Sequence, residues 1–242
     1  MNNERGVDAF SSIGNRILRS LPLDQFYRLR SRLEPFHLRS GVTLYEAGCP
    51  ISQVYFPNGG LVSLLASTEE GQVVEVAMAG IDGMVGIPIA LERDTMPYRA
   101  TVHVAGTAFR MAAGALREEL DRGGPLRAHL LRYASWLLGE ITQSAICNRF
   151  HSVKARLCRW LLVVGDRTGQ ERFSLTQEFL SQMLGSRRQG VNEAIDSLQA
   201  SRLILYKRGS LSILSREGIE RAACECYSIV KLGYYAYHAA AR

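Results

Sequence analysis

The sequence lacks the features that mark membrane-bound and exported proteins. No stretch approaches the ~18 consecutive apolar residues that a membrane-spanning helix needs. The opening residues, MNNERGVDAFSS, do not contain the apolar core of a signal peptide. These absences predict a cytoplasmic protein with no membrane partner.

Cysteine is also scarce. The five cysteines, at positions 49, 147, 158, 224 and 226, are odd in number and include no CxxC pair. This pattern argues against a disulfide framework and against a structural zinc site, so we expect no metal. Only Cys224-Glu225-Cys226 places two thiols close in sequence. On a helix, side chains two residues apart point about 200° apart, which suits neither chelation nor a disulfide.

Acidic residues are in deficit in one part of the chain only. Residues 1–150 contain 15 Lys+Arg and 15 Asp+Glu, whereas residues 151–242 contain 14 Lys+Arg and 8 Asp+Glu. The whole net charge of +6 therefore lies in the C-terminal part. A basic domain is the electrostatic footprint expected of a protein that binds nucleic acid.

The chain of 242 residues is long enough for two domains, and a hydrophobic content of 47% supplies a sizeable core. After a polar leader (1–20) and a helix at Leu23–Leu33, short β-rich runs alternate with glycine-marked turns from Phe36 to Met111. Such regularly spaced strands predict an antiparallel sandwich or barrel. A short helix, Ala113–Leu120, is then predicted before the Gly123-Gly124-Pro125 break.

The stretch Leu175–Leu198 has the pattern of two short helices joined by a tight turn. Gly185 stands where a chain that leaves a helix needs a left-handed residue. The first helix has an apolar face of Phe179, Leu180, Met183 and Leu184, and the second has one of Val191, Ile195 and Leu198. This is the layout of a helix-turn-helix, whose second helix enters the DNA major groove.

The exposed face of the second predicted helix carries side chains that can read bases. Arg can pair with guanine, Gln or Asn with adenine, and Glu can accept from cytosine. We therefore predict base contacts from Arg188, Gln189, Asn192 and Glu193. Two strand-like runs follow around Lys207-Arg208-Gly209-Ser210, which predicts a basic hairpin or wing. Ser186, Arg187, Lys207 and Arg208 are the predicted contacts to the DNA backbone.

A long helix is predicted between the β-rich region and the helix-turn-helix. Its residues Leu130, Ala134, Leu137, Ile141 and Ser144 follow the 4, 3, 4, 3 spacing of a coiled-coil seam. Because this helix links two domains, we interpret the seam as a two-fold dimer interface, although such a stripe can also pack on its own domain. Ser152 is the expected N-cap of the next helix, Val153–Val164.

A β-roll, a long helix and a C-terminal winged helix-turn-helix, in this order, resemble the Crp/Fnr superfamily of bacterial transcription regulators. The resemblance runs from about residue 20 and is strongest in Thr176–Ile213. It implies an α+β chain with a cyclic-nucleotide-binding-like antiparallel β-roll (21–125), a dimerisation helix (126–150) and a winged helix-turn-helix (151–242). It also implies a homodimer that binds double-stranded DNA of the nucleoid, in many members with RNA polymerase as a partner.

The effector pocket departs from the pattern of family members that bind cyclic nucleotides. Those members carry a Phe-x-Gly-Glu-Leu segment, in which the Glu holds the ribose, followed by Arg-Ser-Ala, in which the Arg pairs with the phosphate. The matching positions here are Gly86-Ile87-Pro88 and Arg99-Ala100. Ile87 removes the sugar acceptor, so this resemblance implies a different ligand or none, and argues against cyclic AMP as a cofactor.

Two other classes stay open at this stage. A cupin-like metal enzyme would need several His and carboxylate ligands, yet only His37 and His103 fall in the β-rich region, and no nucleophile with a base is evident. We therefore expect no enzymatic activity. A winged-helix adaptor that binds protein is the third class, and base-specific DNA binding distinguishes it from a regulator.

Overall fold

The computed structural model describes residues 13–239 and divides the chain into two compact units. The first comprises the described residues up to 64 together with 78–136 and 237 onward, and the second comprises 65–77 and 137–236. The boundary falls inside one long helix, α5 (Pro125–Phe150), rather than at either of its ends. The helix predicted for 126–150 is thus present, and its two halves belong to different units.

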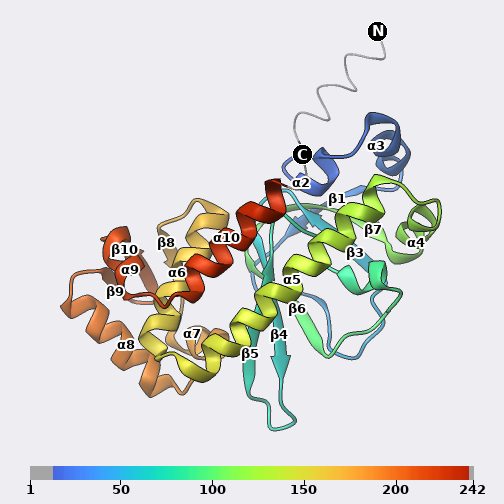
Figure 1. Cartoon of the computed structure of the whole chain (residues 1–242). Coiled ribbons are helices and arrows are strands. Elements are labelled where there is room, and N and C mark those ends of the chain that lie inside the picture. Colours follow the sequence, from blue (N-terminus) through green and yellow to red (C-terminus); the bar gives the residue numbers. More distant parts are fainter. Residues whose placement is uncertain (1–12, 240–242) are drawn as a thin grey trace. The chain divides into compact units, whose positions relative to one another are not determined.

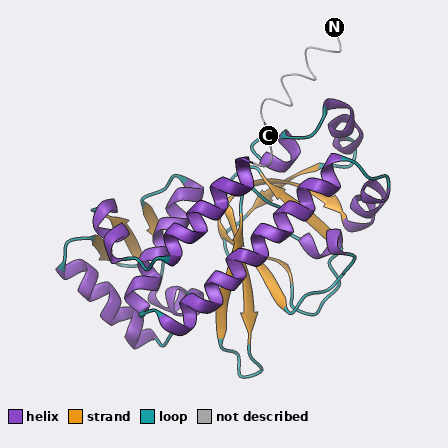
Figure 2. Ribbon diagram, in the orientation of Figure 1, coloured by secondary structure: helices purple, strands orange, loops and turns teal. Residues whose placement is uncertain are grey.

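The first unit is built on antiparallel strands (orange in Figure 2). One sheet has the order β1-β7-β3 and the other has the order β2-β6-β4-β5, with the ends of β4 and β5 reaching into the second unit. The strands are β1 (Glu34–Leu38), β2 (Thr43–Tyr45), β3 (Gln53–Pro57), β4 (Leu61–Ser67), β5 (Val73–Ala79), β6 (Tyr98–Val104) and β7 (Gly106–Ala112). Side chains such as Phe56, Leu61 and Val102 are buried between these strands. The predicted β-roll is confirmed.

Short helices accompany these sheets. They are α2 (Arg16–Arg19), α3 (Leu23–Arg30), the 3-10 helix η1 (Ile87–Leu91) and α4 (Ala113–Asp121). The helices predicted at Leu23–Leu33 and Ala113–Leu120 are therefore present with small shifts at their ends.

The polar leader predicted for residues 1–20 is wrong from residue 13 onward, and residues 1–12 lie outside the described part of the chain. Ile17 and Leu18 are buried, and Asn15 caps α2 and is itself buried. The Asn15 side chain donates hydrogen bonds to the carbonyls of Pro57 (3.0 Å) and Gly83 (2.9 Å). This segment therefore belongs to the packed core of the first unit.

The second unit contains the C-terminal half of α5 and the predicted winged helix-turn-helix (Figure 1). Its further elements are α6 (Val153–Thr168), β8 (Arg172–Ser174), α7 (Gln177–Met183), α8 (Arg188–Ala200), β9 (Ile204–Lys207), β10 (Ser210–Ile213), α9 (Arg216–Ala222) and α10 (Cys226–Ala239). Helix α6 packs against α8 and α9, and the sheet has the order β8-β10-β9. Strand β8 and helices α9 and α10 were not predicted.

Candidate nucleic-acid interface

The predicted helix-turn-helix is present with the expected local geometry. Thr176 caps α7 by accepting a hydrogen bond from the Phe179 amide at 3.0 Å, and Ser152 caps α6 in the same way. Gly185 has φ +51°, and an added Cβ there would lie 2.8 Å from the Val74 side chain. Both observations explain why glycine is required at the turn. Buried residues Leu180, Val191 and Ile195 fix α7 and α8 in the core of the unit.

The second helix, α8, presents three of the four predicted base-reading residues to solvent. Arg188, Gln189 and Glu193 are exposed, and the Gln189 amide donates to the Glu193 carboxylate at 3.0 Å. Asn192 differs, because it is half-buried and its Oδ1 atom is inaccessible and accepts no hydrogen bond within the described part of the chain. The exposed surface on which base contacts can form is therefore made by Arg188, Gln189 and Glu193.

The start of α8 is suited to an anion. Arg187 is the N-cap residue and makes no side-chain capping hydrogen bond. Amides in the first turn of a helix have no partner within that helix, and the helix dipole adds positive potential there. Arg187 is exposed and Ser186 is half-buried beside these amides. A phosphate group is a natural ligand for such a helix end.

The predicted wing is a β-hairpin with a two-residue turn and a basic tip. Lys207 pairs with Ser210, and the two residues between them, Arg208 and Gly209, have φ +50° and +76°. Positive φ at both central positions is the signature of a type I′ turn, whose twist matches that of the flanking strands. Lys207 and Arg208 are both exposed at this tip.

Two residues that the sequence did not single out hold the wing in place. The Tyr206 amide donates to Gln199 Oε1 at 2.7 Å, which ties β9 to the end of α8. The Tyr206 hydroxyl donates to the Leu175 carbonyl at 3.0 Å, which ties the same strand to the segment before α7. These bonds fix the spacing between the wing and α8. The sequence gives little sign of these bonds, because Tyr206 is 7 residues from Gln199 and 31 residues from Leu175.

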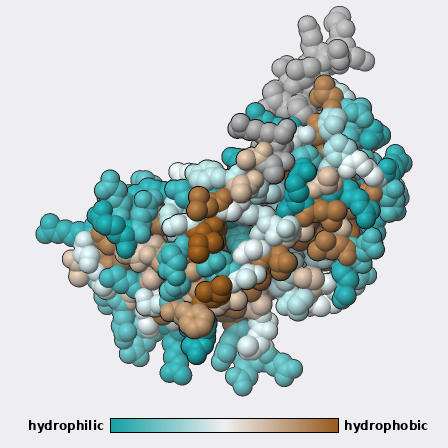
Figure 3. Space-filling model, in the orientation of Figure 1, coloured by the Kyte–Doolittle hydropathy of each residue, from teal (hydrophilic) through white to brown (hydrophobic). Residues whose placement is uncertain are grey.

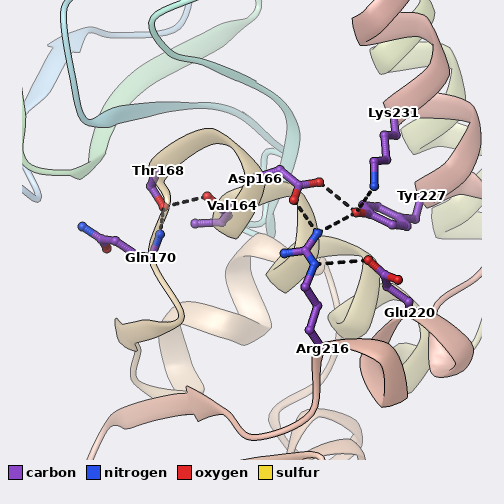
Figure 4. A network of polar contacts seen from close by, with 8 residues as sticks. All are labelled: Val164, Asp166, Thr168, Gln170, Arg216, Glu220, Tyr227 and Lys231. Carbon is purple, nitrogen blue, oxygen red and sulfur yellow. Dashed lines mark hydrogen bonds and ion pairs between the residues drawn. The ribbon is translucent and has the colours of Figure 1, made fainter.

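Helices α9 and α10 are fastened to α6 by a network of polar side chains (Figure 4). The Arg216 guanidinium forms an ion pair with Asp166 and donates to the Tyr227 hydroxyl at 3.0 Å. The Tyr227 hydroxyl in turn donates to the second oxygen of Asp166 at 2.8 Å, and Lys231 donates to Tyr227 at 3.3 Å. The network thereby joins the start of α9 and the first turns of α10 to α6.

The five residues of the predicted dimer seam lie mostly inside the single chain, and their role in a dimer stays a prediction. Leu130, Leu137 and Ser144 are buried within the chain itself, and Ala134 and Ile141 are half-buried. Side chains that already pack in their own chain are not available to a second copy. A neighbouring row on α5 is exposed instead. Its large apolar members are Leu131, Leu138, Ile146 and Phe150.

The residues of the predicted effector pocket lie in two elements of the first unit. Gly86, with φ +94°, precedes η1, and Ile87 begins that helix with a buried apolar side chain. Arg99 and Ala100 lie in β6; Ala100 is buried, and the Arg99 Nε atom is inaccessible and has no hydrogen-bond partner within residues 13–239.

The two histidines that a cupin-like site would use lie in different sheets. His37 is in β1 and His103 is in β6. Neither belongs to the group of metal-ligating side chains found among the described residues. Among residues 13–239, no helix has the length and apolar character that crossing a membrane requires.

This geometry defines a winged helix-turn-helix protein of the DNA-binding class, and comparisons with known proteins agree. Residues 155–222 match the family model of the Crp-like helix-turn-helix domain. A CRP-like cAMP-activated global transcriptional regulator of Mycobacterium tuberculosis is 24% identical over 202 residues, which is 81% of this chain and 90% of the relative.

Solved structures show the same fold over most of the chain. A putative transcriptional regulator of the Crp/Fnr family from Eubacterium rectale has a TM-score of 0.69 at 14% identity and covers 86% of this chain and 97% of its own. FixK2 from Bradyrhizobium japonicum has a TM-score of 0.67 at 13% identity, with 79% and 98% covered. The second unit thus contains a Crp-like helix-turn-helix domain, and most of the chain has the same fold as these two structures. The Mycobacterium tuberculosis relative and the Eubacterium rectale protein are both named as transcriptional regulators.

Proposed function

We propose that this protein is a homodimeric transcription regulator that reads a palindromic DNA site through α8. The observation that carries the proposal is the exposed face of Arg188, Gln189 and Glu193. It lies on the helix whose N-terminus is open to a phosphate, in a unit that also holds a rigid basic wing. The proposed base-reading and backbone-binding groups thus occur in one unit. In DNA-binding proteins, contacts to the backbone position the protein on the duplex, and contacts to the bases select the sequence.

Charge supports this assignment. The excess of basic residues in 151–242 supplies the sequence-independent attraction to DNA phosphates. Two copies related by a two-fold axis would place their recognition helices on half-sites about one helical turn apart, or a multiple of it. We include RNA polymerase as a further partner and the cytoplasmic nucleoid as the place of action, because both follow from the proposed role.

The exposed apolar row on α5 supports the homodimer. In Figure 3 apolar surface (brown) is visible over α5 and α10. The exposed residues there include Leu138 and Ile146 on α5 and Ile229 and Leu232 on α10. Large apolar side chains that gather on a surface mark a protein interface more often than single scattered ones do.

We further propose that cyclic AMP does not regulate this protein. The Mycobacterium tuberculosis relative is named as cAMP-activated. Here a buried Ile87 stands where cyclic-nucleotide-binding members have the ribose-binding Glu, and Pro88 follows it. Arg99 alone can still pair with an anion. Titration calorimetry with cyclic AMP and cyclic GMP should show no binding, and saturable micromolar binding that Arg99→Ala abolishes would contradict the proposal.

The DNA proposal is tested by selecting preferred sites from random double-stranded DNA and comparing three variants. Arg188→Ala should weaken binding to the preferred site by about 1–3 kcal/mol, or about 5- to 150-fold, and relax the preference at one base pair in each half-site. Lys207→Ala should weaken all sequences alike and reduce the dependence of binding on salt. Arg221→Ala, an exposed arginine on α9 of the same unit, is the matched control and should change neither.

Two results would count against this assignment. An unchanged site preference in Arg188→Ala, with an altered one in Lys207→Ala, would move base reading to the wing. Failure of the dimer to enrich any DNA sequence would favour the protein-binding adaptor.

A further inference from the structure

Three cysteines and one histidine meet at the junction between α5 and α10. The ligand atoms of Cys147, His151, Cys224 and Cys226 all lie within 4.8 Å of one another. The three thiols are buried and none forms a disulfide, and His151 is half-buried. All four residues belong to the second unit. The expectation from sequence that the thiols of Cys224 and Cys226 point apart is wrong.

Local backbone structure explains how the four side chains converge. Cys147 lies in the last turn of α5, and the His151 amide donates to its carbonyl at 3.1 Å, so the two side chains share one helix face. Helix α9 ends before Cys224, because Ala223 is extended (φ −73°, ψ 157°). Cys226 is the first residue of α10. Since Cys224 is not helical, the two thiols of this pair reach the same point.

The distances fit a single tetrahedral ion. Zinc–sulfur bonds of about 2.3 Å and zinc–nitrogen bonds of about 2.0 Å place neighbouring ligand atoms of a tetrahedral site about 3.5–3.8 Å apart. Here the sulfurs of Cys147 and Cys224 are 3.5 Å apart, and the Cys226 sulfur is 3.4 Å from His151 Nδ1. A four-iron cluster needs its cysteine sulfurs to stand further apart than this, so the geometry favours one ion.

The outer hydrogen bonds also have the arrangement of a metal site. His151 Nδ1 faces the thiols, while its Nε2 lies 3.1 Å from the Glu225 carboxylate. A metal-binding imidazole commonly donates its second N–H to a carboxylate, which orients the ring and raises its basicity. The Gln143 amide donates to the Cys226 sulfur at 3.0 Å, as it would to a thiolate. A cluster of thiols that served only as apolar packing would gain nothing from these polar partners.

We propose that Cys147, His151, Cys224 and Cys226 bind one zinc ion that fastens α10 to the end of α5. Binding would displace the three thiol protons and leave the sulfurs as thiolate ligands. With all four positions of the tetrahedron filled by protein, the ion has no open site for a substrate and is structural. Its binding would stabilise the second unit at the point where α5 gives way to α6, independently of which DNA sequence α8 reads.

The test begins with the full-length protein purified at neutral pH with no metal added. Elemental analysis should find about one zinc per chain. Cys147→Ser and Cys226→Ser should lose it, whereas Cys158→Ser, which removes a buried thiol outside the cluster, should retain it. Glu225→Gln should keep the four ligands but bind zinc about 10- to 100-fold more weakly. Because ligand variants can misfold, removal of zinc from the wild type with a strong chelator provides a second measurement. The thermal midpoint should fall and should recover when zinc is returned.

Substitution of the wild type with Co²⁺ should give the visible absorption of a tetrahedral thiolate site. Three results would overturn the proposal. The first is a metal-free wild type that contains five free thiols and does not take up zinc. The second is a Cys147–Cys224 disulfide, seen as a mass loss of two hydrogens with a linked peptide, which would make the cluster a redox pair. The third is iron with acid-labile sulfide in place of zinc.

Discussion

Truncation of Leu138 to Ala should separate the two copies of the protein without unfolding either one. Leu138 lies on the exposed row of α5 and retains 65% of its surface in the single chain. Complete burial of a leucine side chain contributes about 1.5–3 kcal/mol, so covering this one is worth about 1–2 kcal/mol. A two-fold interface uses the residue twice, which gives about 2–4 kcal/mol per dimer. The dimer dissociation constant should therefore rise about 30- to 1,000-fold.

Sedimentation across a concentration series measures this constant directly. Leu214→Ala is the matched control, because Leu214 is 58% exposed but lies after β10, away from α5 in the sequence. Leu137→Ala is the contrast: this neighbour is 4% exposed, so its loss should cost about 2–5 kcal/mol of folding stability. If Leu138→Ala dimerises as tightly as the wild type, the exposed row of α5 is not the interface.

Two further predictions concern stability. Arg167→Met should lower the free energy of unfolding in urea by about 3–5 kcal/mol, because it leaves the Glu140 carboxylate buried without its 2.9 Å ion-pair partner; the two side chains are only 4% and 5% exposed. The double variant with Glu140→Leu should recover most of that loss. A loss below about 1 kcal/mol in the single variant would contradict the reasoning. Burial lowers the pKa of His103 to about 4, from about 6.5 when unfolded, so folding favours the neutral ring. The neutral ring therefore contributes its full stabilisation above pH ~6.5, and about 2–3 kcal/mol of folding stability should be lost as the pH falls toward 4. His103→Gln should make the free energy of unfolding less dependent on pH between 6.5 and 4. An unchanged pH dependence in this variant would refute the assignment.

The elements with strong local signals were predictable from sequence. Ser152 caps a helix where expected, and Gly185 takes the left-handed conformation that the turn requires. The wing was recognisable because two strand-like runs flank the short basic segment Lys207-Arg208-Gly209-Ser210. In each case the deciding interactions join residues fewer than five apart, so a short stretch of sequence contains them.

Short stretches of sequence could not predict which apolar row of α5 is buried and which is exposed. Helix α5 has two adjacent apolar rows, one through Leu130 and Leu137 and the other through Leu131 and Leu138. The two leucines of each row are seven residues apart, and this spacing alone does not say which row packs on the chain's own core. In the structure Leu130 and Leu137 are buried, whereas Leu131 and Leu138 are exposed.

The environment of Gly190 is a second feature that the sequence alone did not predict. Because Gly190 stands between the predicted base-reading residues, the sequence suggests a position where the DNA groove would approach the helix closely. An added Cβ would instead lie 3.4 Å from the Ser186 hydroxyl and 3.6 Å from the Val153 side chain of α6. A methyl group fits there in ordinary contact, so the position faces the protein rather than the open side of α8.

The cysteine cluster shows why a pairwise reading of sequence can miss a site. The argument that Cys224 and Cys226 point apart holds only if one helix contains both, and the extended backbone at Ala223 breaks that condition. Cys147 and Cys224 are separated by 77 positions, so the motif becomes visible only when α9 and α10 are folded back onto α5. The network that ties Arg216 and Tyr227 to Asp166 holds the first turn of α10, directly after the segment that contains Cys224. Helix α10 and the short segment before it, which carried no recognisable motif, therefore supply half of the candidate metal ligands.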